Sequence, residues 1–67
     1  MYLQNLSKLR KEKGLTQEGL AQKAGISFHT LVKIEGGGIK NPKIETVIKL
    51  AGALGITIDD LVSKSKK

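Results

Sequence analysis

The chain has 67 residues, no cysteine and a single histidine, so neither disulfides nor a metal centre is expected to reinforce its core. Its 12 Lys and Arg outnumber its 6 Asp and Glu, and the formal net charge of +6 favours partners that carry negative charge. The length allows one domain, no apolar run reaches the ~18 residues of a membrane span, and the scarcity of acids and aromatics argues against an enzyme site.

Positive charge is concentrated in the first two thirds of the chain. Residues 1–43 hold eight Lys and Arg against three acids, a net of +5, whereas residues 44–67 hold four against three, a net of +1. This asymmetry favours one half that faces a polyanion and another that is mainly structural. A merely soluble basic surface explains the charge equally well until a motif is considered.

The apolar pattern predicts five helices, and therefore an all-α fold. The first helix is expected over residues 3–13, where leucines recur on one face, and Gly14 ends it. Thr16 can cap a second helix, because its hydroxyl can accept a backbone N–H. We expect this second helix to run to residue 24.

The second and third predicted helices have the pattern of two helices that cross near a right angle. Gly25 can adopt the left-handed bend between them without Cβ strain, and the small Ala21 lets the backbones approach. Ser27 can cap the third helix, which is expected to run to about residue 35. A helix held out in this way is the usual device for entering the major groove of DNA.

A loop at residues 36–43, with the turn signal Asn41-Pro42, separates the third helix from the fourth. The fourth helix is expected over residues 44–54 and is ended by Gly55. Its inner face is expected to consist of Ile44, Val47, Ile48, Leu50, Ala51 and Leu54.

A short fifth helix closes the predicted domain. Thr57 can cap it, and Asp60 three residues later completes a pair that is similar to a capping box. Residues 1–62 are therefore expected to form one domain, and residues 63–67 a disordered basic tail. The apolar residues of this end exceed what the core needs, so they either form a homodimer surface or only close the domain: Ile56, Ile58, Leu61 and Val62.

The outward face of the third predicted helix is unusual for a solvated helix. With its leucine and C-terminal isoleucine directed inward, at about 100° per residue, the residues that remain outside suit the edges of DNA bases. Phe28 either contacts thymine methyl groups or folds back over the core edge, and His29 and Val32 can also be ordinary surface residues. The candidate base-reading residues are Phe28, His29, Val32 and Lys33.

Two opposite charges fall on inner faces of the predicted helices. Arg10 lies on the leucine face of the first helix, and Glu35 lies on the inner side of the third. An unpaired charge in the interior costs several kcal/mol. We therefore expect Arg10 and Glu35 to form a largely buried ion pair, of the kind that can be bidentate. The alternative is two surface charges that extend to water.

Four motifs carry a resemblance that covers roughly residues 3–62, and they are Gly14-Leu-Thr-Gln-Glu-Gly-Leu-Ala-Gln-Lys-Ala-Gly-Ile-Ser27, Leu31-x-x-Ile34-Glu35-x-Gly37, Asn41-Pro42 and Leu50-Ala-Gly-Ala-Leu-Gly-Ile56. In combination they resemble the lambda-repressor-like, Cro-type (XRE-type) helix-turn-helix regulators, whose fold is a compact five-helix domain. The chain departs from that pattern at Gly19, where Glu is common, at Phe28, where a polar residue is usual, and at Lys43, where Ser or Thr often caps.

The resemblance implies a set of DNA contacts. Phe28, His29 and Lys33 stand where such repressors read bases, although Phe28 prevents an operator sequence from being transferred. Gln17 is implied to contact a phosphate and to brace the first residue of the third helix. The remaining implied backbone contacts come from the loop, and they are Lys40, Asn41 and Lys43. Arg10 and Glu35 match a pair that the family uses as a bridge.

The expected function is therefore sequence-specific binding of double-stranded DNA by a cytoplasmic transcriptional regulator, in first place a repressor, without cofactor or metal. One domain covers little DNA, so a homodimer on a palindromic operator is expected, with half-sites about 34 Å apart. RNA polymerase is a further candidate partner. Two alternatives stay open: an antitoxin or protein-binding adaptor of the same fold that holds a toxin partner, and a domain cut from a longer regulator.

Overall fold

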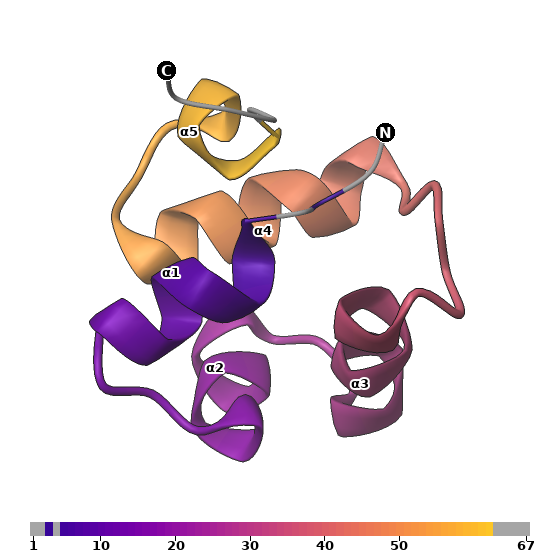
Figure 1. The fold of residues 1–67 in the computed structure, drawn as a ribbon, viewed down its shortest axis with the longest axis horizontal. Helices are drawn as coiled ribbons and strands as arrows, with labels where there is room; N and C mark the ends of the chain where they lie inside the picture. The colour runs from indigo at the N-terminus through magenta and orange to yellow at the C-terminus, as the bar shows by residue number, and fades with distance from the viewer. Residues whose placement is uncertain (1–2, 4, 63–67) are drawn as a thin grey trace.

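The structure is a computed structural model that describes residue 3 and residues 5–62. This part of the chain contains α-helices and no strand (Figure 1), so the predicted all-α fold is confirmed. The predicted tail at residues 63–67 lies outside the described residues. None of the described helices has the length and apolar character that crossing a bilayer requires. The helices are α1 (Leu6–Glu12), α2 (Gln17–Ala24), α3 (Phe28–Gly36), α4 (Ile44–Leu54) and α5 (Ile58–Val62).

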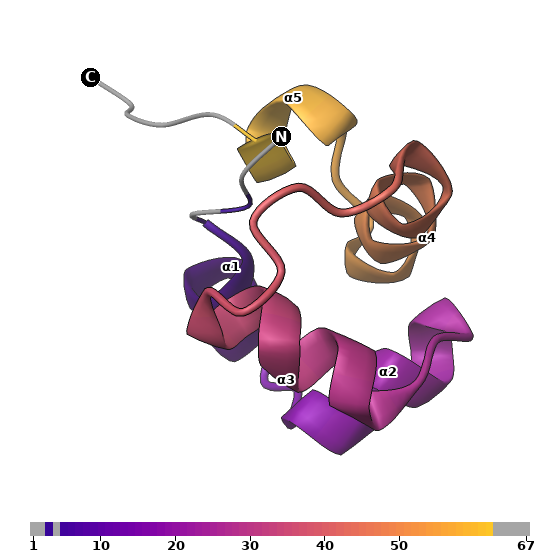
Figure 2. The ribbon, with the colours of Figure 1, turned by 90° about the vertical axis from the view of Figure 1, so that its right-hand side faces the viewer.

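Helix α4 is the centre of the fold. It packs against α2 on one side and against α5 on the other, and α2 packs in turn against α3. Figure 1 shows α2 and α3 on the side of α4 that faces away from α5, and Figure 2 shows the long loop that leads from α3 to α4. The buried apolar residues that hold these helices together are Leu3, Leu6, Leu20, Ala21, Ala24, Leu31, Ile34, Val47, Leu50, Ala51, Leu54 and Leu61.

Hydroxyl caps begin three of the helices, as the sequence predicts. The Thr16 hydroxyl accepts from Gly19 N at 2.9 Å, and the Ser27 hydroxyl accepts from Thr30 N at 3.2 Å. At α5, the Thr57 hydroxyl accepts from Asp60 N at 3.0 Å. Each cap satisfies a backbone donor that has no partner within its own helix. The caps at Thr16 and Ser27 therefore fix the residues at which α2 and α3 begin.

Helix α1 begins at Leu6, three residues later than the sequence predicts. Asn5 precedes it, and its side chain does not cap α1. Its side-chain nitrogen instead donates to the backbone oxygen of Asp60 at 3.1 Å. This contact ties the start of α1 to α5, an interaction between residues 55 positions apart that a local pattern does not reveal.

The apolar stripe of α4 is wider than the core that covers it. Ile44 is 50% exposed and Ile48 is 53% exposed, so their predicted place on the inner face is wrong. Val47, Leu50, Ala51 and Leu54 are buried. At about 100° per residue, Ile48 lies roughly 110° from the centre of this buried group, on a side of α4 that the core does not cover. The apolar type of a residue therefore does not by itself place it in the core.

The apolar end of the domain also differs from expectation. Leu61 is fully buried and belongs to the core, so the prediction that it exceeds what the core needs is wrong. The three other apolar residues of this end are half-buried and pack against the core: Ile56, Ile58 and Val62. If two copies of the chain meet at this end, only the exposed parts of these three side chains can lie in the contact, and Leu61 cannot.

Gly52 is a position at which a substitution should stabilise α4. It lies inside α4, and a Cβ added there meets nothing within 4 Å. We expect Gly52→Ala to raise the free energy of unfolding by about 1 kcal/mol, because Gly loses more backbone freedom than Ala when a helix forms. Urea denaturation followed by circular dichroism measures this change.

Gly55 provides the matched control, because it ends the same helix with a φ of 71°. A Cβ in this left-handed conformation is strained, so Gly55→Ala should lower the free energy of unfolding by about 1–2 kcal/mol. Destabilisation by Gly52→Ala would contradict the open surroundings seen at that position.

Candidate nucleic-acid interface

The corner between α2 and α3 sets the position of α3. Gly25 takes the left-handed conformation, with a φ of 74°, and its N–H donates to the oxygen of Ala21 at 2.9 Å. The N–H of Ile26 donates to the same oxygen at 3.0 Å. Ala21 is buried beside Leu20 and Leu31, whose side chains are fully buried. One face of α3 is therefore packed against the protein while the opposite face stays outside.

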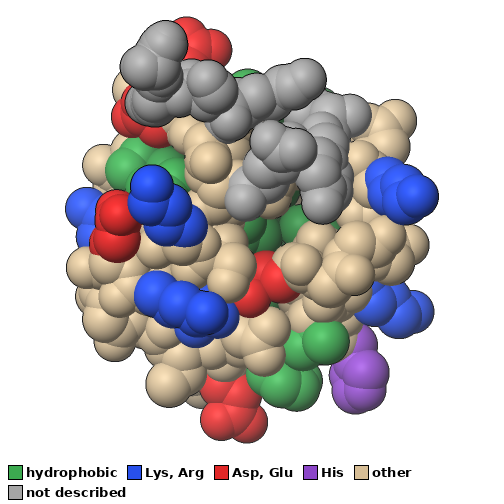
Figure 3. Space-filling view, viewed as in Figure 1, with side chains coloured by type: hydrophobic (Ala, Val, Ile, Leu, Met, Phe, Trp, Pro, Cys, Tyr) green, Lys and Arg blue, Asp and Glu red, His purple; other side chains and the backbone are tan. Residues whose placement is uncertain are grey.

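The outward face of α3 carries the four residues that the sequence singles out as base-reading candidates. Phe28 is 43% exposed and Val32 is 37% exposed, and His29 and Lys33 are exposed as well. Phe28 does not fold back over the core. Its ring instead lies edge-to-face with that of His29, with 6.2 Å between the ring centroids and 79° between the planes. The histidine projects from the rim of the molecule as the purple side chain of Figure 3.

The candidate phosphate-binding residues lie on two flanks of α3. Gln17 is the first residue of α2 and is half-buried. Lys40, Asn41 and Lys43 come from the loop between α3 and α4, and all three are exposed. Figure 1 shows α2 on one side of α3 and this loop on the other. The structure therefore brings the candidates together as a central face with a polar group on either side.

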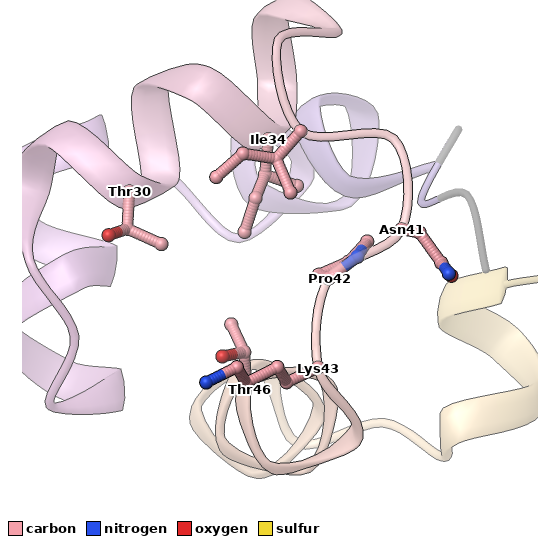
Figure 4. A pocket seen from close by; sticks show the side chains of 7 residues that line it. Thr30, Ile34, Asn41, Pro42, Lys43 and Thr46 are labelled. Atoms are coloured by element: carbon pink, nitrogen blue, oxygen red, sulfur yellow. The ribbon is translucent and has the colours of Figure 1, made fainter.

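A cleft of about 380 Å³ separates α3 from the start of α4. Figure 4 shows that the Lys43 side chain runs past Thr46 toward the side of the cleft on which Thr30 lies. The Asn41 side chain points in the opposite direction, although Asn41 is among the residues that line the cleft. Lys43 is the N-cap position of α4, but its side chain makes no capping hydrogen bond. An ammonium group has no acceptor and cannot cap a helix N-terminus, and Lys43 is exposed, so this group can reach a partner outside the helix. The cleft is lined by Thr30, Ile34, Ile39, Asn41, Pro42, Lys43 and Thr46.

A buried ion pair joins α1 to α3, and the predicted Arg10–Glu35 contact is present. Arg10 Nε donates to Glu35 Oε2 at 2.7 Å, and Nη2 donates to Oε1 at 3.1 Å. The two side chains are only 11% and 7% exposed. Nη1 of the same guanidinium donates to the backbone oxygen of Leu15 at 2.8 Å. The pair is thus bidentate, and it also holds the turn that precedes α2.

Gln17 joins this network in a way that the sequence did not predict. Its side-chain nitrogen donates to Glu35 Oε1 at 3.1 Å, the oxygen that also accepts from Arg10. Gln17 thus holds a residue near the C-terminal end of α3, and the implied bracing of the first residue of that helix stays a prediction. Residues 17 and 35 lie on different helices, so only knowledge of how α2 crosses α3 could have revealed this bond.

Comparisons with known proteins agree in relating this chain to helix-turn-helix transcriptional regulators. The family model described as helix-turn-helix matches residues 6–61. The chain is 42% identical over 59 residues to the uncharacterized HTH-type transcriptional regulator y4dJ of Sinorhizobium fredii, covering 88% of this chain and 75% of that protein. It is 39% identical over 66 residues to the cryptic phage CTXphi transcriptional repressor RstR of Vibrio cholerae, covering 98% of this chain and 59% of that protein.

A solved structure agrees with these relatives. The crystal structure of SinR, described as the master regulator for biofilm formation and solved in complex with DNA, has a TM-score of 0.87 and 33% identity. The match covers 94% of this chain and 100% of that one. The likeness therefore extends over nearly the whole fold.

The buried ion pair should be needed for stability. Glu35→Gln leaves the Arg10 guanidinium in the interior without its counter-charge, so we expect the free energy of unfolding to fall by about 3 kcal/mol. Glu12→Gln is the control, because Glu12 is exposed on α1 and its change should stay within about 0.5 kcal/mol. Denaturant titration of both variants measures the difference. Equal, small losses would mean that the pair contributes no more than a surface contact.

Proposed function

Because this chain belongs to the helix-turn-helix family of transcriptional regulators, we propose that it binds double-stranded DNA in a sequence-dependent manner and regulates transcription as a repressor. The family points to binding and not to catalysis. Its match to a DNA-bound structure over nearly the whole fold supports the DNA as partner. A similar fold also occurs in the complex of the SinR and SinI proteins, so protein binding stays the second candidate function.

The observation that carries this proposal is the outward face of α3. A helix surface that exposes Phe28 and Val32 beside His29 and Lys33 is poorly suited to water alone. It suits the major groove, where thymine presents a methyl group and guanine presents the acceptors O6 and N7. In this proposal Phe28 and Val32 contact thymine methyl groups, Lys33 donates to guanine, and His29 exchanges a hydrogen bond with a base edge.

The flanking residues supply the contacts that fix the register. Phosphate contacts position a protein on the duplex, and base contacts select the sequence. Lys40, Asn41 and Lys43 would meet the backbone on one side of α3, and Gln17 would meet it on the other. The charge of Glu35 is balanced by Arg10, so it does not oppose the approach of phosphates. The net charge of the chain, +6, favours the same partner.

Specificity of useful strength would need two copies of this domain. A single small module covers little DNA, and helix-turn-helix dimers bind half-sites about 34 Å apart. A homodimer on a palindromic operator therefore belongs to the proposal, with repression by exclusion of RNA polymerase from the promoter. The surface between the copies would use exposed parts of Ile56, Ile58 and Val62 and would leave Leu61 in the core.

Base-reading and phosphate-binding lysines should behave differently when they are removed. With a duplex selected from random sequences by the wild-type protein, we expect Lys33→Ala to weaken binding by about 1–3 kcal/mol and to relax the preference at one base pair. Fluorescence anisotropy on the selected duplex and on single-base variants of it measures both effects. Equal losses on selected and random duplexes would remove Lys33 from the base-reading set.

Removal of a phosphate contact should instead weaken all sequences alike. We expect Lys43→Ala to reduce the slope of log K against log salt by about one unit, because one fewer phosphate is neutralised. Lys23→Ala is the control with the same charge change, because Lys23 lies beside the C-terminal end of α4, away from the loop. An unchanged slope in Lys43→Ala would exclude this lysine as a phosphate contact.

A further inference from the structure

One side-chain amide joins the interior of the protein to the proposed DNA contacts. Gln17 Nε2 donates to Glu35 Oε1 at 3.1 Å. A primary amide nitrogen carries two N–H donors, so a second donor remains for another acceptor. Gln17 is the first residue of α2, where the backbone N–H groups of the first turn have no partner within the helix. Thr16 caps Gly19 N, and the second amide donor lies at the same end of α2 as the remaining first-turn N–H groups.

We propose that Glu35 is a positioning residue for DNA binding: it holds the Gln17 side chain so that the second N–H of that amide meets a phosphate oxygen. This inference rests on the proposed DNA binding and assigns a second task to a carboxylate whose first task is structural. The ligand group is a non-bridging oxygen of the DNA backbone.

The geometry supports this task because each group in the chain of contacts is itself held. Glu35 receives two N–H groups from Arg10, and a third N–H of Arg10 is bound to the Leu15 oxygen. The carboxylate and the guanidinium are both buried. A glutamine side chain otherwise has several rotatable bonds whose freedom is lost on binding. The bond to Glu35 removes that freedom before DNA arrives, which favours binding.

Arg10 and Gln17 bind the same oxygen of Glu35, so the arrangement requires a carboxylate at position 35. Glu35 Oε1 accepts from Arg10 Nη2 and from Gln17 Nε2, each at 3.1 Å. A carboxylate offers several lone-pair sites, whereas a neutral amide at position 35 would offer only one oxygen and would add donors of its own. Glu35→Gln should therefore disturb the Gln17 amide even where the fold is retained.

A double-mutant cycle on DNA affinity tests this inference. Gln17→Ala should weaken binding to the selected duplex by about tenfold, as expected for one hydrogen bond to a charged group. The salt slope should stay unchanged, because Gln17 carries no charge. Glu35→Gln should weaken binding about tenfold more when Gln17 is present than in the Gln17→Ala background, because only the first case loses the held amide. Anisotropy measured well below the melting temperature of each variant gives these values.

Each contrary outcome has a distinct meaning. If the wild-type chain selects and binds no duplex, the proposed function fails. If it binds DNA but Glu35→Gln causes the same loss with and without Gln17, the positioning role is wrong while DNA binding stands. If Gln17→Ala leaves the affinity unchanged, Gln17 is not a contact and the inference is also wrong.

A second set of variants keeps the test open if Glu35→Gln does not fold. Glu35→Asp retains the negative charge opposite Arg10 but shortens the side chain by one methylene, which withdraws the oxygen from Gln17. It can be made in the Gly52→Ala background, where α4 is expected to be more stable. The same non-additivity with Gln17→Ala is expected, and additive losses would overturn the proposal.

Discussion

A carboxylate placed in the interior has to be neutralised where it lies, and the rest of this structure is arranged around that constraint. Glu35 receives two N–H groups from Arg10 of α1 and one from Gln17 of α2. Three helices of the same apolar core are therefore also joined at one polar point. An isolated charge at this depth costs several kcal/mol, so the three helices keep a fixed arrangement relative to one another.

The outward face of α3 depends on this arrangement. Leu31 and Ile34 anchor the helix from its inner side, and Glu35 fixes its C-terminal turn against α1 and α2. Phe28, His29, Val32 and Lys33 then remain exposed on the opposite side of the helix. In a chain of this size the core is small. Polar contacts with defined geometry therefore complement the apolar packing in setting how α3 is presented.

Local signals made much of the fold predictable. Thr16, Ser27 and Thr57 have the side chains that cap helices, and the left-handed Gly25 marks the corner between α2 and α3. Once Leu31 faces inward, the helical repeat decides which residues of α3 face outward. The Arg10–Glu35 pair was predictable for a related reason, because two opposite charges on inner faces require partners.

The features that were missed depend on distances between helices. Ile44 and Ile48 are exposed because the core covers only part of the surface of α4, and the pattern of α4 does not show which part. The contact of Asn5 with Asp60 and that of Gln17 with Glu35 join helices that are remote in the sequence. For the candidate site, the residues of the outward face could be named in advance, whereas the hydrogen bond that organises one flank could not.

The most direct measurement is a titration of the ¹⁵N-labelled protein with its selected duplex, followed by amide chemical shifts in NMR spectra. The account predicts the largest changes at residues 16–18, 28–33 and 40–44, smaller changes at residues 56–62 where two copies would meet, and little change at residues 50–54. Largest changes along α4 and α5 with an unaffected α3, or no change anywhere, would contradict it.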